Sequence, residues 1–169
     1  MNDIVIDAGP IIHLSQLKLF NLLELFPLLH TSAEVWNEIT RFDLPGKKEV
    51  EKAENIKVHR VSEKEKSAIR HKVKIFRLQS PDLSLLALCL KLAGQKILTD
   101  DLELRKTAES LGWETYGSLG IILRAYKKNR LSLSETKESL NNLFNISSLY
   151  LSPKLLNRVL VELSKEKKP

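Results

Sequence analysis

The sequence is poor in residues that cross-link or interrupt a fold. Its 169 residues include one cysteine, six prolines and six glycines, which excludes a disulfide framework and does not favour a disordered chain. No apolar stretch reaches the roughly 18 residues that a membrane-spanning helix requires. Because the first residues read as a strand rather than a leader, we expect a cytoplasmic protein.

The remaining composition is that of a globular domain. Hydrophobic residues make up 43% and charged residues 28% of the chain, so a chain of this length can bury one continuous core. Cys89 lies in an apolar run, residues 85–90, where a buried small hydrophobe is favoured over a nucleophile. We therefore expect one domain without disulfide support.

The net charge is +6 and the pI is about 9.4. This balance favours an acidic partner, which for a cytoplasmic protein is most often nucleic acid. Part of the excess lies in Lys165, Lys167 and Lys168, and a solvated tail is the simpler interpretation of these three. The charge alone is thus a weak indication of RNA binding.

Short apolar segments alternate with segments of helical periodicity. Strands are expected at residues 4–6, 28–30, 56–61, 96–99 and 113–116, and the first helical pattern runs from about residue 14 to 25. Later helices begin at capping patterns, namely Thr31 with Glu34, Ser62 with Glu65, Ser80, Ser118, and Ser132 with Glu135. Parallel strands need long crossovers, so we predict a three-layer α/β/α sandwich with a central, mainly parallel sheet of four to five short strands.

Acidic residues follow two of the expected strands. Asp7 follows the first strand, and Asp100 and Asp101 follow residues 96–99. The carboxyl ends of parallel strands meet at one edge of a sheet. Carboxylates gathered there repel one another unless a cation or a shared proton neutralises them, and oxygen ligands favour magnesium or manganese over zinc.

Each acidic residue also has a simpler interpretation. Asp7 could cap the helix after Pro10, and Asp82 could complement the dipole of its own helix. Glu38 could be a solvated charge, and Asp100 and Asp101 could be a loop residue and an N-cap. The functional interpretation therefore depends on the set rather than on any member.

The order of these residues resembles that of the PIN-domain family, and within it the VapC-like toxin ribonuclease subgroup. The matching positions are Asp7 in Ile-Val-Ile-Asp, Glu38 in Glu-Val-Trp-Asn-Glu-Ile, Asp82 in Ser-Pro-Asp-Leu, and Thr99-Asp100-Asp101. Residues 7–14 and 117–125 are similar to the subgroup as well. The resemblance implies a single PIN-like domain, residues 1–169, with residues 130–169 as a C-terminal helical extension.

The resemblance further implies a metal-dependent endoribonuclease that uses Mg²⁺ or Mn²⁺. Asp7 would be the central ligand and Glu38, Asp82 and Asp101 would complete the catalytic and metal-binding set. Asp100 would support Asp101 or replace it, because one residue reverses the direction of a strand side chain; Asp101 is slightly preferred. His13 lies near this set, where a buried or capping histidine is favoured over a catalytic one.

Expected partners follow from the same resemblance: RNA as substrate, an antitoxin protein and a second copy of the chain in a homodimer. Other folds with an aspartate after the first strand fit poorly, because a haloacid-dehalogenase-like phosphatase needs a second aspartate where Gly9 stands. The alternative function is a noncatalytic PIN-like module that binds RNA or protein.

Overall fold

A five-stranded parallel sheet forms the centre of the computed structural model, which describes residues 3–73 and 78–165. The strand order is β3-β2-β1-β4-β5. Every pairing between neighbouring strands is parallel, so the predicted sheet is confirmed. The strands are β1 (Ile4–Ile6), β2 (Leu29–Ser32), β3 (Ile56–His59), β4 (Lys96–Leu98) and β5 (Glu114–Tyr116).

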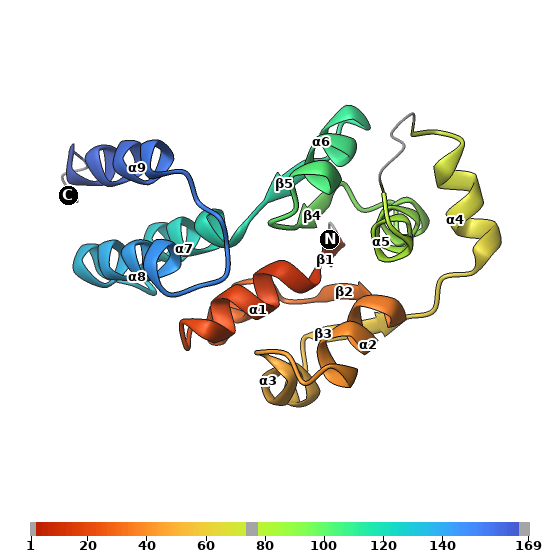
Figure 1. Ribbon diagram of the computed structural model, residues 1–169, viewed down its shortest axis with the longest axis horizontal. Helices are drawn as coiled ribbons and strands as arrows, with labels where there is room; N and C mark the ends of the chain where they lie inside the picture. Colours follow the sequence, from red (N-terminus) through yellow and green to blue (C-terminus); the bar gives the residue numbers. More distant parts are fainter. Residues whose placement is uncertain (1–2, 74–77, 166–169) are drawn as a thin grey trace.

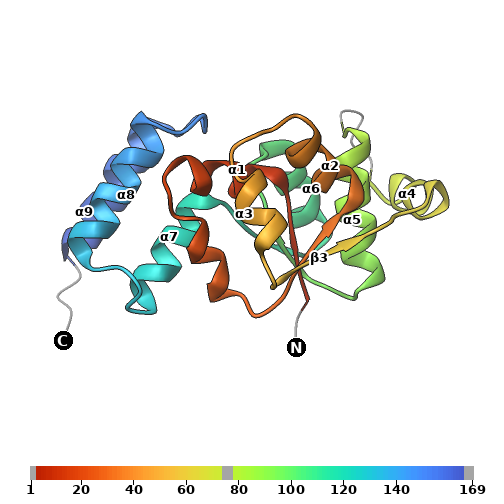
Figure 2. The same cartoon turned by 90° about the horizontal axis from the view of Figure 1, so that it is seen from below.

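Helices flank the sheet in an α/β/α arrangement, and the C-terminal helices lie together to one side of it (Figures 1 and 2). They are α1 (Ala8–Gln16), the 3₁₀ helix η1 (Phe20–Leu25), α2 (Ala33–Arg41), α3 (Lys47–Lys52), α4 (Glu63–Arg70), α5 (Ser80–Lys91), α6 (Leu102–Ser110), α7 (Ser118–Lys127), α8 (Leu133–Asn145) and α9 (Pro153–Lys165). Within residues 3–73 and 78–165, no helix is long and apolar enough to cross a membrane. Lys167 and Lys168 lie outside the described residues.

The core forms where α5 packs against the central strands. Val5, Ile97 and Leu86 are fully buried there, as expected for parallel strands covered by helices. Cys89 is buried on α5, its thiol donates to the Gly94 carbonyl, and burial raises the pKa of this thiol to about 12. The predicted inert, buried cysteine is therefore confirmed.

Several helix starts differ from the predicted ones by one residue. Ser32, not Thr31, caps α2, because the Thr31 hydroxyl donates across the sheet to the Ile6 carbonyl. Gln79 rather than Ser80 precedes α5, and Gly117 rather than Ser118 precedes α7. The predicted capping boxes of Ser62 with Glu65 and of Ser132 with Glu135 are confirmed.

The first predicted helix is in fact two. α1 ends at Gln16, and the chain continues through Lys18, whose φ of 59° is left-handed and cannot continue an α-helix. A 3₁₀ helix follows from Phe20. This early end places the C-terminal end of α1 close to the α8–α9 connection, to which it is hydrogen-bonded through Gln16.

Candidate active site

Four acidic residues are presented by four different elements. Asp7 follows β1 and caps α1, and Asp101 follows β4 and caps α6. Since β1 and β4 are adjacent and parallel, the two aspartates lie at the same edge of the sheet. Glu38 lies on α2 and Asp82 in the first turn of α5.

Thr99 connects the two strand-end aspartates. Its buried hydroxyl donates to Asp7 Oδ2 at 2.8 Å and accepts from the Asp101 backbone N–H at 3.0 Å. The other Asp7 oxygen, Oδ1, accepts from the Ala8 N–H at 2.7 Å. The Asp7 carboxylate is thus held at both oxygens, and its orientation is fixed before any ligand arrives.

The four acidic groups interact electrostatically. Burial raises the pKa of Asp7 to about 7; hydrogen bonds from Thr99 and Ala8 oppose this rise, and repulsion by Asp82 and Glu38 adds to it. Burial, then repulsion by Asp82, raises the pKa of Glu38. Burial also raises the pKa of Asp82, against a backbone hydrogen bond from Gln79 and with repulsion by Asp101. A chain of mutual repulsion therefore links all four, which we call the carboxylate cluster: Asp7, Glu38, Asp82 and Asp101.

The chemistry of this cluster suits a hard divalent cation. All of its donors are carboxylate oxygens, and a cation would relieve the repulsion between them. Within the described part of the chain, however, no three His, Cys, Asp or Glu side chains converge closely enough to hold an ion between them. An ion at this cluster would therefore bind through one or two carboxylates and complete its coordination with water.

Asp100 belongs to a different network. Its Oδ2 lies 2.7 Å from His13 Nδ1 and accepts from the Ser118 hydroxyl at 2.5 Å, while Oδ1 accepts from the Ser118 N–H at 2.7 Å. A Cβ added at Gly117 would lie 2.5 Å from Asp100 Oδ1, so only glycine permits this approach. The side chain of Asp100 is 6% exposed, whereas Asp101 is exposed.

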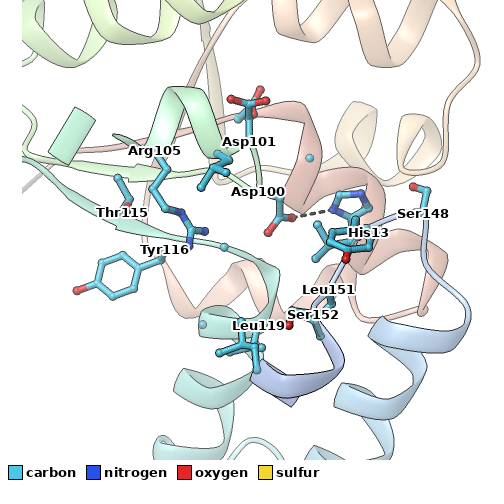
Figure 3. Close-up of a pocket in the computed structure, with 18 residues that line it drawn as sticks. His13, Asp100, Asp101, Arg105, Thr115, Tyr116, Leu119, Ser148, Leu151 and Ser152 are labelled. Atoms are coloured by element: carbon cyan, nitrogen blue, oxygen red, sulfur yellow. Dashed lines mark hydrogen bonds and ion pairs between the residues drawn. The ribbon is translucent and has the colours of Figure 1, made fainter. Parts of the chain in front are cut away.

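A cavity of about 820 Å³ opens beside the cluster (Figure 3). Asp7, His13, Asp100 and Asp101 line one part of it, but Glu38 and Asp82 do not. The cavity therefore lies on the α6 side of Asp7. Its other walls come from α6, β5, the start of α7, the α8–α9 connection and the start of α9, and include Arg105, Tyr116, Leu119, Tyr150 and Leu155.

Sequence reasoning found the carboxylates but missed the groups around the cavity. The contact between His13 and Asp100 joins residues 87 positions apart, and no local pattern marks it. Gly117-Ser118 at the end of β5 was a usable signal, because a glycine beside a strand end often marks a close backbone approach. Arg105 and Tyr150 carried no signal of their own.

Comparison with known proteins gives one family match. The model of the family DUF3368, described as PIN domain, matches residues 3–165. No curated protein sequence matches the chain. Among solved structures, Mycobacterium tuberculosis VapC20, a toxin that cleaves the sarcin-ricin loop, is similar at 15% identity and a TM-score of 0.47, covering 66% of this chain and 96% of that one. This structural likeness is too weak to bear on function.

Proposed function

The chain belongs to the PIN-domain family, and on that premise we propose that it is a divalent-metal-dependent endoribonuclease. The observation that carries the proposal is the position of Asp7 at the carboxyl edge of the sheet, where Ala8 and Thr99 hold its two oxygens and Thr99 also connects it to the exposed Asp101. Burial, with repulsion by Asp82 and Glu38, raises the pKa of Asp7 to about 7 and supports this observation. Burying a carboxylate next to other carboxylates disfavours its charged form, and sites with such perturbed groups are commonly functional. We further propose that residues 1–169 form one PIN-like domain, with residues 130–169 as its helical extension.

Asp7 would be the central ligand of Mg²⁺ or Mn²⁺. Asp101, Glu38 and Asp82 would complete the coordination directly or through water. Such an ion, when bound, polarises a phosphate and lowers the pKa of a bound water. Thr99 keeps the Asp7 carboxylate in a fixed orientation, which limits the reorganisation that binding requires.

Asp101 suits the role of ligand better than Asp100. Both oxygens of Asp100 already accept hydrogen bonds from the protein. Asp101 uses only Oδ1, which accepts from the Leu104 N–H at 2.7 Å, so Oδ2 remains available. We propose that Asp101 binds the ion and that Asp100 supports the site by positioning His13 and Ser118.

RNA cleavage tests this assignment. A mixed-sequence RNA is incubated with Mn²⁺ or Mg²⁺ and the wild type, Asp7→Asn, or Asp43→Asn as the matched control; the Asp43 side chain is 83% exposed. The proposal predicts cutting by the wild type and the control, loss in Asp7→Asn, and loss with EDTA. Equal cutting by Asp7→Asn would place the activity elsewhere.

One observation favours a second candidate, a noncatalytic PIN-like module that binds RNA or protein. The described side chains do not converge on an ion, as expected if metal binding has been lost. Such a module would cut no RNA with either ion and would gain no thermal stability from them. RNA binding that persists in Asp7→Asn without cleavage by the wild type would favour this candidate.

Family membership also motivates proposals about location and assembly. We propose a cytoplasmic protein that forms a homodimer and is held by an antitoxin protein. α9 buries Leu156 and Leu163 against its own chain but leaves Leu155 and Val161 about half exposed, at 45% and 52%. Light scattering on the purified chain, with Val161→Lys as the variant, tests whether α9 contributes to the dimer.

A further inference from the structure

We propose that the cavity beside Asp7 is a binding site for an unpaired nucleotide of the RNA substrate, with Tyr150 stacking on the base and Arg105 contacting a phosphate. The inference deepens the proposed ribonuclease function and takes its class of substrate from it. It commits to single-stranded RNA as the occupant, because the cavity combines an exposed aromatic ring, an arginine that forms no ion pair with the described residues, and a direct connection to the carboxylate cluster.

Tyr150 is presented to solvent by a segment that is itself anchored. It lies in the α8–α9 connection with 89% of its surface exposed, between Leu149, packed against the core, and Leu151, which is 8% exposed. Gln16 Oε1 on α1 accepts hydrogen bonds from the Ser148 N–H and hydroxyl at 2.9 and 3.2 Å. A single exposed aromatic is ordinary on a protein surface, but this one lines the cavity that also contains Asp7 and Asp101.

Arg105 supplies positive charge inside the same cavity. In the view of Figure 3 its side chain extends from α6 into the space bordered by Tyr116 and Asp100. One Nη2–H donates to the Thr99 carbonyl at 3.1 Å, and Nε is buried and has no hydrogen-bond partner among residues 3–73 and 78–165. Among the ion pairs of the described residues, none involves Arg105.

A fixed guanidinium with spare donors and no carboxylate partner is suited to bind an anion. Arginine binds phosphate through its planar set of N–H groups. Thr99 contacts both side chains: its carbonyl accepts from Arg105 and its hydroxyl donates to Asp7. A phosphate bound by Arg105 would therefore lie next to the carboxylate cluster. The geometry therefore joins a phosphate contact to the proposed site of cleavage.

The cavity has a suitable size for this ligand. Its volume of about 820 Å³ falls within the range of roughly 300–1,000 Å³ that small-ligand pockets occupy, so one unstacked nucleotide can enter it. Single-stranded RNA is recognised chiefly by bases that leave the stack and pack on aromatic rings. The substrate is therefore expected to be unpaired at the nucleotide next to the scissile phosphate.

Binding without metal tests the inference separately from catalysis. Fluorescence anisotropy of a labelled 12-nucleotide mixed-sequence RNA is measured in EDTA, as a single strand and as a duplex. The full chain is compared with Tyr150→Ala, Tyr150→Phe, Arg105→Gln and Phe42→Ala; Phe42 is an exposed aromatic, 69% exposed, outside the cavity. Circular dichroism confirms that each variant is folded.

The expected loss in Tyr150→Ala is between about 5-fold and 150-fold in affinity for the single strand. Tyr150→Phe keeps the ring and should stay within about 2-fold, as should Phe42→Ala. Arg105→Gln should weaken binding and lower the salt dependence by about one phosphate contact. The wild type should bind the single strand more tightly than the duplex.

If Tyr150→Ala and the wild type bind the single-stranded RNA with equal affinity, the inference is overturned, and a protein segment becomes the better candidate for the occupant of the cavity. Absence of RNA binding by the wild type would also overturn it. If the wild type cuts RNA with metal but Tyr150→Ala binds the single strand as tightly as the wild type, the nucleotide site is contradicted and the proposed ribonuclease activity is not. If RNA binding depends on Tyr150 but the wild type cuts no RNA, the proposed activity is contradicted and the nucleotide site is supported.

Discussion

His13 Nδ1 lies 2.7 Å from Asp100 Oδ2, which ties α1 to the segment that follows β4. Ser118 at the start of α7 donates to the same carboxylate through its hydroxyl and its N–H. One side chain therefore connects three elements at the carboxyl edge of the sheet. Its neighbour Asp101 is exposed, and among the described residues its side chain accepts only from the Leu104 N–H of its own helix, so adjacent aspartates have different roles.

This difference predicts that the same substitution destabilises the protein more at Asp100 than at Asp101. Asp100→Asn places an amide N–H₂ against groups that donate, so we expect it to lower the free energy of unfolding by roughly 1–3 kcal/mol. Asp101→Asn keeps an oxygen that can cap α6, so its cost should stay below about 0.5 kcal/mol. Urea unfolding of both variants checks this, and a larger loss in Asp101→Asn would contradict it.

Asp7 should make the metal-free protein less stable as the pH rises. Its pKa in the folded state is about 7, above the ordinary 3.8. Between these two values the folded state holds a proton that the unfolded state has lost, so stability falls as pH rises from about 4 to 7. Asp7→Asn removes this loss, so its stability relative to the wild type should rise by on the order of 2 kcal/mol between pH 5 and pH 8, after allowing for partial solvent exposure.

The measurement is urea unfolding in EDTA at pH 5 and pH 8. Asp43→Asn serves as control, because Asp43 is exposed and has a left-handed φ of 54° that asparagine tolerates. The free energy of unfolding of Asp7→Asn, relative to the wild type, should rise from pH 5 to pH 8, while Asp43→Asn should follow the wild type at both pH values. A difference that is the same at both pH values would show that Asp7 titrates normally.

Thr99→Val should affect both strand-end aspartates. Valine keeps the buried volume but removes the donor to Asp7 and the acceptor for the Asp101 N–H, at a cost of roughly 1–3 kcal/mol. Because the Thr99 hydrogen bond lowers the pKa of Asp7, its loss should raise that pKa further and move Mn²⁺ binding to higher pH. Thr99→Ser should restore both properties; failure of the serine variant to do so would assign the effect to packing.

A histidine pair at the opposite part of the sheet predicts acid sensitivity. His30 Nδ1 and His59 Nε2 are 2.8 Å apart, so one of the two nitrogens must be unprotonated. Burial, then the positive neighbours His30, Lys57 and Lys91, lowers the pKa of His59 below 6.5. Stability should therefore fall as pH drops through 6.5, since the unfolded state takes up a proton first.

His59→Gln tests this prediction by thermal unfolding between pH 5 and 8. The variant keeps a polar group toward His30 but does not titrate in this range. Its melting temperature should fall less than that of the wild type on acidification. Parallel curves for the two proteins would mean that other groups control the acid response.

The sequence predicted the features that local patterns determine. Asp7 and Asp101 could be placed at one edge because β-branched runs define where β1 and β4 end. Thr31 and Ser32 could not be distinguished as caps, since each is a hydroxyl residue before a helix and only the contact of Thr31 with the Ile6 carbonyl decides between them. The cavity is formed by α6, β5 and the α8–α9 connection together. Because these elements are distant in sequence, no local pattern could predict that Tyr150 lines a cavity beside Asp7.

Calorimetric titration of Mn²⁺ into the metal-free protein at pH 8 tests the central claim that the carboxylate cluster holds a divalent ion. Wild type and Asp43→Asn should bind with equal affinity, and Asp7→Asn should bind at least about 10-fold more weakly, the size of effect seen even for residues that only support a metal site. Absence of binding to the wild type, or equal binding by Asp7→Asn, would contradict the account.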